Sequence, residues 1–222
     1  MKLLFVALAS AAPLTLALLS TPATVLAPAA SSTLAGGQDP AARDADAAPE
    51  AAPEQPIRHR IEVNAAGERM LVEEVIVEAP LAKVWWAYTT GPGMQAWAAP
   101  LAEVDLRAGG TIRTNYEPEG ELGGPGTNTL HIVNWVPERV LTLRAELNDN
   151  WPELMQRDAG NLMNVVLFEE LGPRRTRIES YGVGYGDDPA YDGLLGFFAQ
   201  ANRGLYVELK RALEEPEPES ER

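Results

Sequence analysis

Nitrogen and sulfur side chains that could bind a metal ion are few in this chain. It has no cysteine and only two histidines, His59 and His131, in 222 residues. Zinc sites usually take several nitrogen or sulfur ligands, so this supply does not predict one. His131 is expected to be a pairing or surface residue of a strand, with a position lining a cavity as the alternative. We therefore expect no metal ion and no cofactor.

Motifs for nucleophilic catalysis are also absent. No serine lies in a Gly-x-Ser-x-Gly elbow, and there is no His-Glu-x-x-His. The run GVGYG at 182–186 superficially resembles a phosphate loop, but the lysine and hydroxyl residue of a nucleotide-binding loop do not follow it. We interpret it as a kinked strand end that lets a helix approach. No catalytic residue is predicted, and whether the protein is an enzyme stays open.

Two groups of carboxylates could still perform chemistry. Asp187 and Asp188, with nearby Asp192, could bind calcium, but the ligand spacing of a calcium loop is missing. A helix cap explains the first two, because Pro189 follows them at the start of a predicted helix. The pair at 169–170 lies where a strand runs into a turn. A general acid/base pair is conceivable there, but carboxylates at a strand exit are ordinarily solvated.

The N-terminus has the pattern of an export signal. Lys2 is the only charge before the apolar run at 3–19, and small residues follow up to Ala30. This order predicts a signal peptide at 1–29, cleaved after Ala29, and a periplasmic or secreted protein. An uncleaved membrane anchor is the alternative. The run and its Pro13 disfavour it, because a membrane span needs about 20 apolar residues.

Composition divides the rest of the chain. Residues 30–56 and 215–222 hold mainly alanine, proline and acids, which predicts a disordered linker and a disordered acidic tail. Residues 57–214 are enough for one core and therefore one domain. The formal charge of −14 is spread over linker, core and tail. It argues against nucleic acid and anionic membrane surfaces as partners. No segment after the signal approaches membrane-spanning length, so no membrane insertion is expected once the signal is removed.

Hydrophobic periodicity predicts how the domain is ordered. The β-branched stretch at 70–79 indicates a strand, and two short helices follow it at 81–88 and 94–98. Short turns separate the later runs of strand-like sequence, which implies antiparallel pairing. These further strands are expected at 103–107, 111–116, 127–136, 140–147, 162–171 and 175–185.

The last element has the clearest pattern. After the cap at 187–189, apolar residues recur every three or four positions over about 25 residues, which predicts an amphipathic helix that covers a sheet. Its apolar positions are Tyr191, Leu194, Phe198, Ala201, Leu205, Leu209 and Ala212. Together these elements predict an α+β fold in two layers.

This order of elements resembles the helix-grip fold of the START-like, or SRPBCC, superfamily. The matching stretches look like the branch named after homologues of the C-terminal domain of the heat-shock ATPase activator. They are VIVEAP at 75–80 with VW at 84–85, VDLR at 104–107 with GG at 109–110, PERVL at 137–141, and LGP at 171–173 with TR at 176–177. The resemblance spans residues 70–213. It implies a curved antiparallel sheet of six to seven strands wrapped around the long C-terminal helix.

The resemblance also implies an apolar or mixed cavity between sheet and helix. Small residues at Ser180 and Gly182 would leave space beneath the helix, and aromatic residues would either wall that space or fill it. The residues expected to line the cavity are Trp97, Ile112, Thr114, Tyr116, His131, Trp151, Asn164, Val166, Ser180, Leu194 and Phe198.

Three functions are compatible with this fold, since a shared fold does not settle an activity. The first hypothesis is an exported binding module for a small apolar or amphipathic ligand. The second is a cyclase- or hydrolase-type enzyme working in the same cavity. The third is a protein-interaction module with a filled core. The run VVLF at 165–168 is apolar on both faces, which predicts a homodimer through the outer sheet face.

Overall fold

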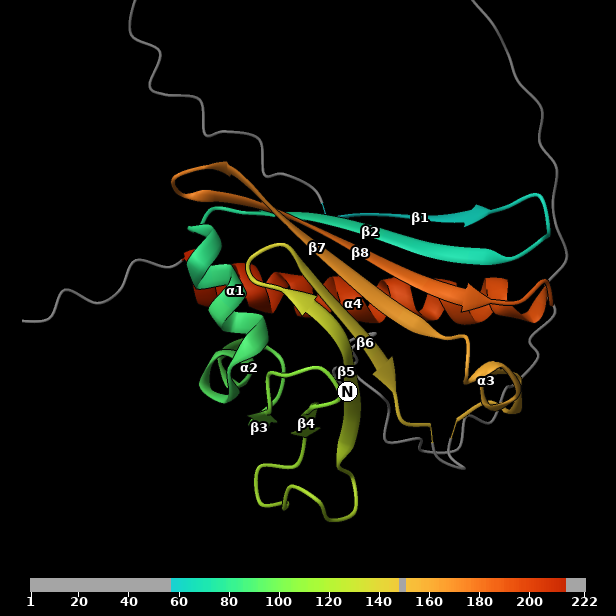
Figure 1. Ribbon diagram of the computed structural model, residues 1–222, viewed down its shortest axis with the longest axis horizontal. Coiled ribbons are helices and arrows are strands. Elements are labelled where there is room, and N and C mark those ends of the chain that lie inside the picture. The colour runs from blue at the N-terminus through green and yellow to red at the C-terminus, as the bar shows by residue number, and fades with distance from the viewer. Residues whose placement is uncertain (1–56, 148–150, 215–222) are drawn as a thin grey trace, which may run out of the picture. The chain divides into compact units, whose positions relative to one another are not determined.

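The computed structural model describes residues 57–147 and 151–214. The signal peptide, linker and acidic tail predicted at 1–29, 30–56 and 215–222 lie outside these residues. An eight-stranded sheet curves around one long helix, α4 (Figure 1). The strands are β1 (Arg58–Val63), β2 (Arg69–Val77), β3 (Leu101–Val104), β4 (Thr111–Asn115), β5 (Asn128–Val136), β6 (Val140–Ala145), β7 (Met163–Gly172) and β8 (Arg175–Tyr185). The helices are α1 (Leu81–Thr89), α2 (Gly91–Trp97), α3 (Glu153–Asp158) and α4 (Ala190–Glu214).

The sheet has the order β1-β2-β8-β7-β6-β5-β4-β3, and each neighbouring pair is antiparallel. The predicted α+β helix-grip fold is therefore confirmed. The sheet has eight strands, whereas six to seven were expected. The additional strand is β1, which lies at the edge of the sheet next to β2. All six residues of β1 are exposed, so the strand has no buried face that would mark it in the sequence.

The glycine run at the end of β8 is a kink, but a different segment approaches it. Gly184 has a φ of +86°, and a Cβ there would lie 1.9 Å from the carbonyl oxygen of Asn161. The close neighbour is thus the chain just before β7, whereas the sequence predicted a helix. Beyond the kink the alternation of faces shifts by one residue, so that Ser180 and Tyr185 are both buried.

The helix α4 has the predicted length, but its buried face is rotated from the predicted one. Leu194, Ala201 and Ala212, which were expected on the apolar stripe, are only half-buried. The buried stripe includes two polar positions, Asn202 and Tyr206, which the sequence pattern passed over. Its members are Tyr191, Leu195, Phe198, Ala199, Asn202, Leu205, Tyr206, Leu209 and Leu213.

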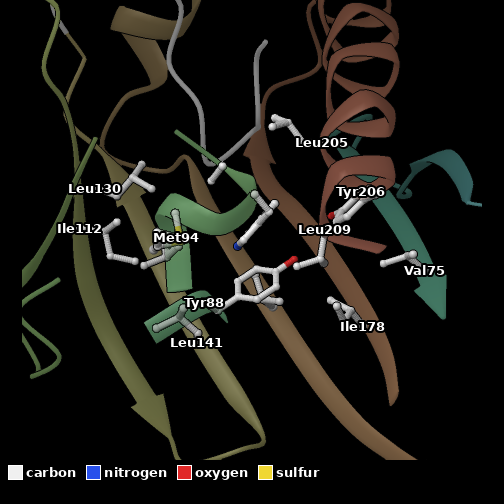
Figure 2. Close-up of a cluster of buried hydrophobic side chains, with 14 of the residues drawn as sticks. Val75, Tyr88, Met94, Ile112, Leu130, Leu141, Ile178, Leu205, Tyr206 and Leu209 are labelled. Carbon is white, nitrogen blue, oxygen red and sulfur yellow. The ribbon is translucent and has the colours of Figure 1, made fainter. Parts of the chain in front are cut away.

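Helices α1 and α2 cover the part of the sheet near the C-terminal end of α4 (Figure 1). Tyr88 of α1 points into the core, with its ring centroid 4.9 Å from that of Trp97 and 5.1 Å from that of Phe168 (Figure 2). α2 begins at Gly91, three residues before the predicted start, because the Thr90 side chain accepts a hydrogen bond from the Gly93 amide at 3.0 Å.

The short helix α3 lies in a stretch for which the sequence pattern predicted no helix or strand. It is a six-residue element beside the start of α4 (Figure 1). Its length is too short for a helical period to show in the sequence. Within residues 57–147 and 151–214, no helix combines the length and apolar character needed to cross a membrane.

Candidate functional site

A carboxylic acid is buried between the sheet and α4. Glu73 of β2 is only 3% exposed. Because successive strand residues point to opposite faces, Glu73 shares the inner face of β2 with Leu71, Val75 and Val77, which are also buried. An ionisable group on an apolar face is unusual, since burying a charge without a partner is costly. Among the residues that the structure describes, no other aspartate or glutamate and no lysine, arginine or histidine is buried.

Two side chains of α4 contact this carboxyl group. Asn202 Nδ2 donates a hydrogen bond to Glu73 Oε2 at 2.9 Å, and the Tyr206 hydroxyl lies 3.4 Å from the same oxygen. Asn202 and Tyr206 are four residues apart, which places them one turn apart on one side of the helix. The buried face of α4 therefore also places two polar side chains against Glu73 of β2.

The environment of Glu73 favours its neutral form. Burial raises the pKa of Glu73 to about 8, against the smaller lowering effect of the hydrogen bonds from Asn202 and Tyr206. The carboxyl group is thus mostly protonated at pH 7. Burial and the nearby Glu73 also raise the pKa of the Tyr88 and Tyr206 phenols, which stay protonated.

Hydrogen bonds extend from this acid across the sheet to β7. Tyr206 makes a side-chain hydrogen bond with Ser180 of β8. Asn164 Nδ2 of β7 donates to Ser180 Oγ at 2.8 Å. Asn164 is 4% exposed, and its Oδ1 has no hydrogen-bond donor among the described residues. We name Glu73, Asn202, Tyr206, Ser180 and Asn164 the inner polar chain.

The residues predicted to line a cavity divide into three groups. The buried ones are Trp97, Ile112, Thr114, Trp151, Asn164, Val166, Ser180 and Phe198. Tyr116 and Leu194 are half-buried and pack at the margin of the core. His131 is exposed.

Some of the buried residues are brought together and others are engaged elsewhere. Asn164 and Ser180 are hydrogen-bonded within the inner polar chain, and the rings of Trp151 and Phe198 lie 6.5 Å apart. Trp97 Nε1 donates to the carbonyl oxygen of Ala87 at 3.0 Å, so its polar atom already has a partner in α1.

His131 does not face the interior, which corrects the alternative of a cavity-lining histidine. Its side chain is 46% exposed, and its Nε2 lies 3.1 Å from Glu146 Oε2. On β5 it is flanked by Leu130 and Ile132, which take the buried face. Strand alternation therefore sends the imidazole outward.

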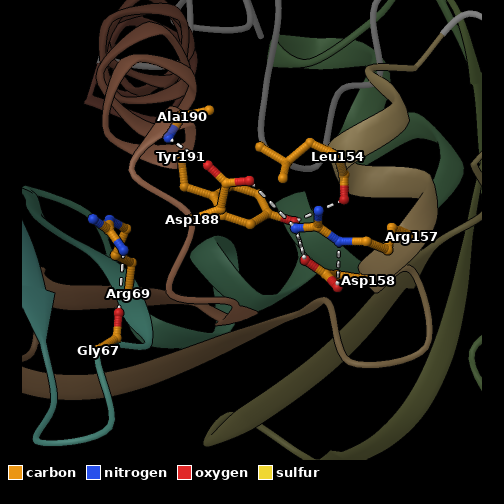
Figure 3. Close-up of polar contacts among 8 residues, drawn as sticks. All are labelled: Gly67, Arg69, Leu154, Arg157, Asp158, Asp188, Ala190 and Tyr191. Carbon is orange, nitrogen blue, oxygen red and sulfur yellow. Dashed lines mark hydrogen bonds and ion pairs between the residues drawn. The ribbon is translucent and has the colours of Figure 1, made fainter.

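The carboxylates weighed as chemical groups have structural partners. Asp188 Oδ1 accepts from the Ala190 amide at 2.9 Å and so caps α4, as the sequence predicted. Arg69 Nε lies 2.5 Å from Asp192 Oδ1 and ties β2 to the helix. No cluster of metal-ligating side chains occurs among the residues that the structure describes. Figure 3 shows Asp188 beside Ala190, and Arg69 with its hydrogen bond to the Gly67 carbonyl oxygen.

The pair at 169–170 does not form a proton-transfer site. Glu169 makes an ion pair with Arg177 of β8, and both side chains are partly exposed. Glu170 is exposed at the end of the same strand. These carboxylates lie on the solvated part of β7, as their position at a strand exit indicates.

The inner polar chain contains three residues that the sequence reasoning missed: Glu73, Asn202 and Tyr206. A signal for each existed. Glu73 alternates with Leu71 and Val75 on a face that is otherwise apolar, and Asn202 and Tyr206 continue the four-residue spacing from Phe198.

Comparison with known proteins identifies the family. The model of the family described as "Activator of Hsp90 ATPase homolog 1-like protein" matches residues 78–214, more than half of the chain. The chain belongs to this family. The predicted START-like relationship is thereby confirmed. The matched range includes α1 to α4 and excludes β2, so Glu73 lies just before it. No curated protein matches the sequence.

Solved structures of low sequence identity share the fold. A crystal structure of a Mesorhizobium loti protein is 18% identical, with a TM-score of 0.50, covering 66% of this chain and 97% of that one. A solution structure of an Arthrobacter aurescens protein is 13% identical, with a TM-score of 0.50, covering 71% of this chain and 92% of that one. Both likenesses concern the fold alone.

Proposed function

We propose that this protein is an exported binding module for a small amphipathic ligand, held between the sheet and α4. The observation that carries the proposal is the buried Asn164, whose Oδ1 has no donor among the described residues. Leaving a buried acceptor unpaired costs about 1–3 kcal/mol, so a bound molecule that donates to it gains that interaction. The buried apolar side chains around the inner polar chain suit the rest of an amphipathic ligand.

Native mass spectrometry tests the binding function. The mature protein is purified from the envelope of its own host, and bound material is extracted with solvent. We expect a discrete added mass that denaturation releases. Asn164→Leu should reduce the bound fraction at least several-fold. Thr176→Val is the matched control, because Thr176 is a buried β8 residue bonded to the Ala79 carbonyl, outside the inner polar chain.

A bare mass would contradict binding. If challenge with lipids and aromatic compounds also leaves the melting temperature unchanged, a filled core and an interaction function are favoured.

Export is the second part of the proposal. The pattern of Lys2, the apolar run at 3–19 and the small residues up to Ala30 supports cleavage after Ala29. N-terminal sequencing of protein from the host envelope should begin at Ala30. A chain that keeps residues 1–29 and sediments with membranes would contradict cleavage and favour an anchor.

Glu73 favours an enzyme as a second candidate function. A carboxyl group with a pKa of about 8 can donate or accept a proton near neutral pH, as general acids and bases do. The test is incubation of the extracted ligand with fresh protein, followed by mass analysis. A chemical change that Glu73→Gln abolishes would establish catalysis, and an unchanged ligand would leave binding alone.

A homodimer through the outer sheet face completes the proposed partners. Val165 and Leu167 are half-buried on that face of β7, and the register places them beside Tyr181 and Glu179 of β8. Light scattering at tens of micromolar should give twice the mass of one chain. A clean monomer would contradict the dimer.

A further inference from the structure

We propose that the ligand is a neutral amphiphile whose polar group donates a hydrogen bond to Asn164 Oδ1, such as an alcohol or an amide N–H. Carboxylates and phosphates are excluded from this position. The inference rests on the proposed binding function and adds the chemical class of the ligand. It follows from the direction of the hydrogen bonds in the inner polar chain and from the absence of a buried cation among the described residues.

Glu73 determines which group donates and which accepts in each hydrogen bond of the inner polar chain. Its Oε2 accepts a hydrogen bond from Asn202, and Tyr206 contacts the same oxygen. An acid oxygen that accepts hydrogen bonds is the carbonyl oxygen of the neutral form, since a carbonyl is the better acceptor. The acidic proton of neutral Glu73 therefore belongs on Oε1. In both protonation states Tyr206 is then the donor toward Glu73.

Each hydroxyl group has a single proton, and this determines which groups donate and which accept in the rest of the inner polar chain. Since the proton of Tyr206 is directed to Glu73, the hydrogen bond between Tyr206 and Ser180 uses the Ser180 proton. The Ser180 oxygen is then the acceptor for Asn164 Nδ2, at 2.8 Å. Turning the amide over would place its oxygen against Ser180 Oγ without a proton between them. The Asn164 carbonyl oxygen is therefore left to accept from another molecule.

The cross-strand neighbours of the buried Asn164 are small on the β8 side. Across the β7–β8 ladder Asn164 pairs with Gly182, which has no side chain, and across the β6–β7 ladder it pairs with Leu143. The next inward residue of β8 is the small Ser180. A polar group that approaches Asn164 thus meets glycine and serine on one side and a leucine on the other.

Electrostatics excludes an anionic group. In the part of the chain that the structure describes, the buried polar residues include no lysine, arginine or histidine, and the single ionisable one is Glu73. A carboxylate beside Asn164 would be desolvated with no cation to compensate it, and it would lie in the same core as an acid. A neutral donor has no such cost and satisfies the open acceptor.

Three probes of equal chain length separate these possibilities: a straight-chain primary alcohol, its methyl ether and the corresponding carboxylate. Affinities for the full mature protein are measured at pH 7 by titration of tryptophan fluorescence. We expect the alcohol to bind at least about tenfold more tightly than the ether, which corresponds to one hydrogen bond of about 1.4 kcal/mol. The carboxylate should bind more weakly than the alcohol by a similar or larger factor.

Substitution assigns the difference to Asn164. Asn164→Leu should bring the alcohol down to the affinity of the ether and leave the ether unchanged. Thr176→Val should keep the tenfold preference. If Asn164→Leu does not fold, the comparison of the three probes on the unaltered protein still decides, because that comparison needs no variant.

The outcomes separate this inference from the binding function beneath it. Equal binding of the three probes, or tighter binding of the carboxylate, overturns the neutral-donor class and keeps the binding module. If no probe binds, the molecule released in the native mass experiment decides the class. A neutral hydroxyl or amide compound supports the inference, a carboxylate or phosphate overturns it, and no released molecule overturns both proposals.

Discussion

Two tyrosines of α4 each contact a carboxyl group, and the two carboxyl groups have opposite pKa shifts. Near the start of the helix, the Tyr191 hydroxyl lies 2.8 Å from Asp158 Oδ2 (Figure 3). One third of the way from its other end, the Tyr206 hydroxyl lies 3.4 Å from Glu73 Oε2. The pKa of Asp158 is lowered, whereas that of Glu73 is raised to about 8.

The neighbours of each pair explain the difference. Asp158 has a cation close by, since Arg157 lies 3.3 Å from its Oδ2, and that hydrogen bond is the main cause of its lowered pKa. Glu73 has only neutral partners, so burial dominates. The same residue types therefore form an ionised anchor at the helix start and a neutral acid in the core. Environment, and not residue type, therefore decides which carboxyl group is ionised and which is neutral.

The largest effect is expected for Glu73→Gln as a function of pH. The carboxyl pKa is about 8 in the folded protein against 4.5 for the unperturbed group. As pH rises through this interval, the unfolded chain ionises first, so the wild-type free energy of unfolding falls by up to about 1.4 kcal/mol per pH unit. The variant has no such loss. Between pH 5 and pH 9, the free energy of unfolding of the variant should therefore rise by on the order of 3 kcal/mol relative to that of wild type. Urea denaturation at pH 5, 7 and 9 measures this change.

The matched control for this experiment is Glu74→Gln. Glu74 is the next residue of β2, on the opposite face, where it pairs with Arg58 at 3.7 Å. It removes a carboxyl group from the same strand without touching the buried site, so it shows how much of the effect belongs to Glu73. Parallel profiles for wild type and Glu73→Gln would show that Glu73 is ionised in the folded protein, which contradicts a neutral acid in the core.

A smaller effect is expected when each tyrosine loses its hydroxyl. Tyr206→Phe leaves the Ser180 proton and one Glu73 contact without a partner in the core, so it should cost about 2 kcal/mol. Tyr191 is itself buried, but its acceptor Asp158 has a side chain that is 19% exposed and keeps Arg157 as a partner, so Tyr191→Phe should cost about 1 kcal/mol or less. Thermal unfolding of both variants at pH 6 measures the difference. A larger loss for Tyr191→Phe would contradict the view that the Tyr206 hydroxyl has the partners that are harder to replace.

The fold was predictable where its causes are local. The cap at Asp188 and the helical period that follows it define α4, and the structure has this helix at Ala190–Glu214. The strand β1 was missed because its residues are exposed on both faces, and only its pairing with β2 makes it a strand. That pairing depends on another part of the chain, which a local pattern does not contain.

The inner polar chain was only half predictable for a similar reason. Asn164 and Ser180 were expected to line the cavity that the family resemblance implied. Glu73 stands beside Glu74, and the two together suggest a solvated stretch. The partners of Glu73 on α4 are 129 and 133 residues away in the sequence. The register between β2 and α4 that joins them is a tertiary contact with no local signal.

The smallest effect is expected for Asp158→Asn, with the opposite dependence on pH. Because the pKa of Asp158 is lowered in the folded protein, its charge stabilises the protein above the unperturbed value of 3.8 and loses this effect as pH falls below it. The pair with Arg157 is partly exposed, so solvent screening limits the contribution to less than about 1 kcal/mol. Urea denaturation of wild type and variant at pH 6 and pH 3 should show the wild-type advantage shrinking at the lower pH. Added salt should shrink it at pH 6 as well, while the pH dependence caused by Glu73 should persist because a buried group is screened much less. An advantage for wild type that grows on acidification would mean that Asp158 is protonated in the folded state, and the contrast between the two tyrosine–carboxyl pairs would then disappear.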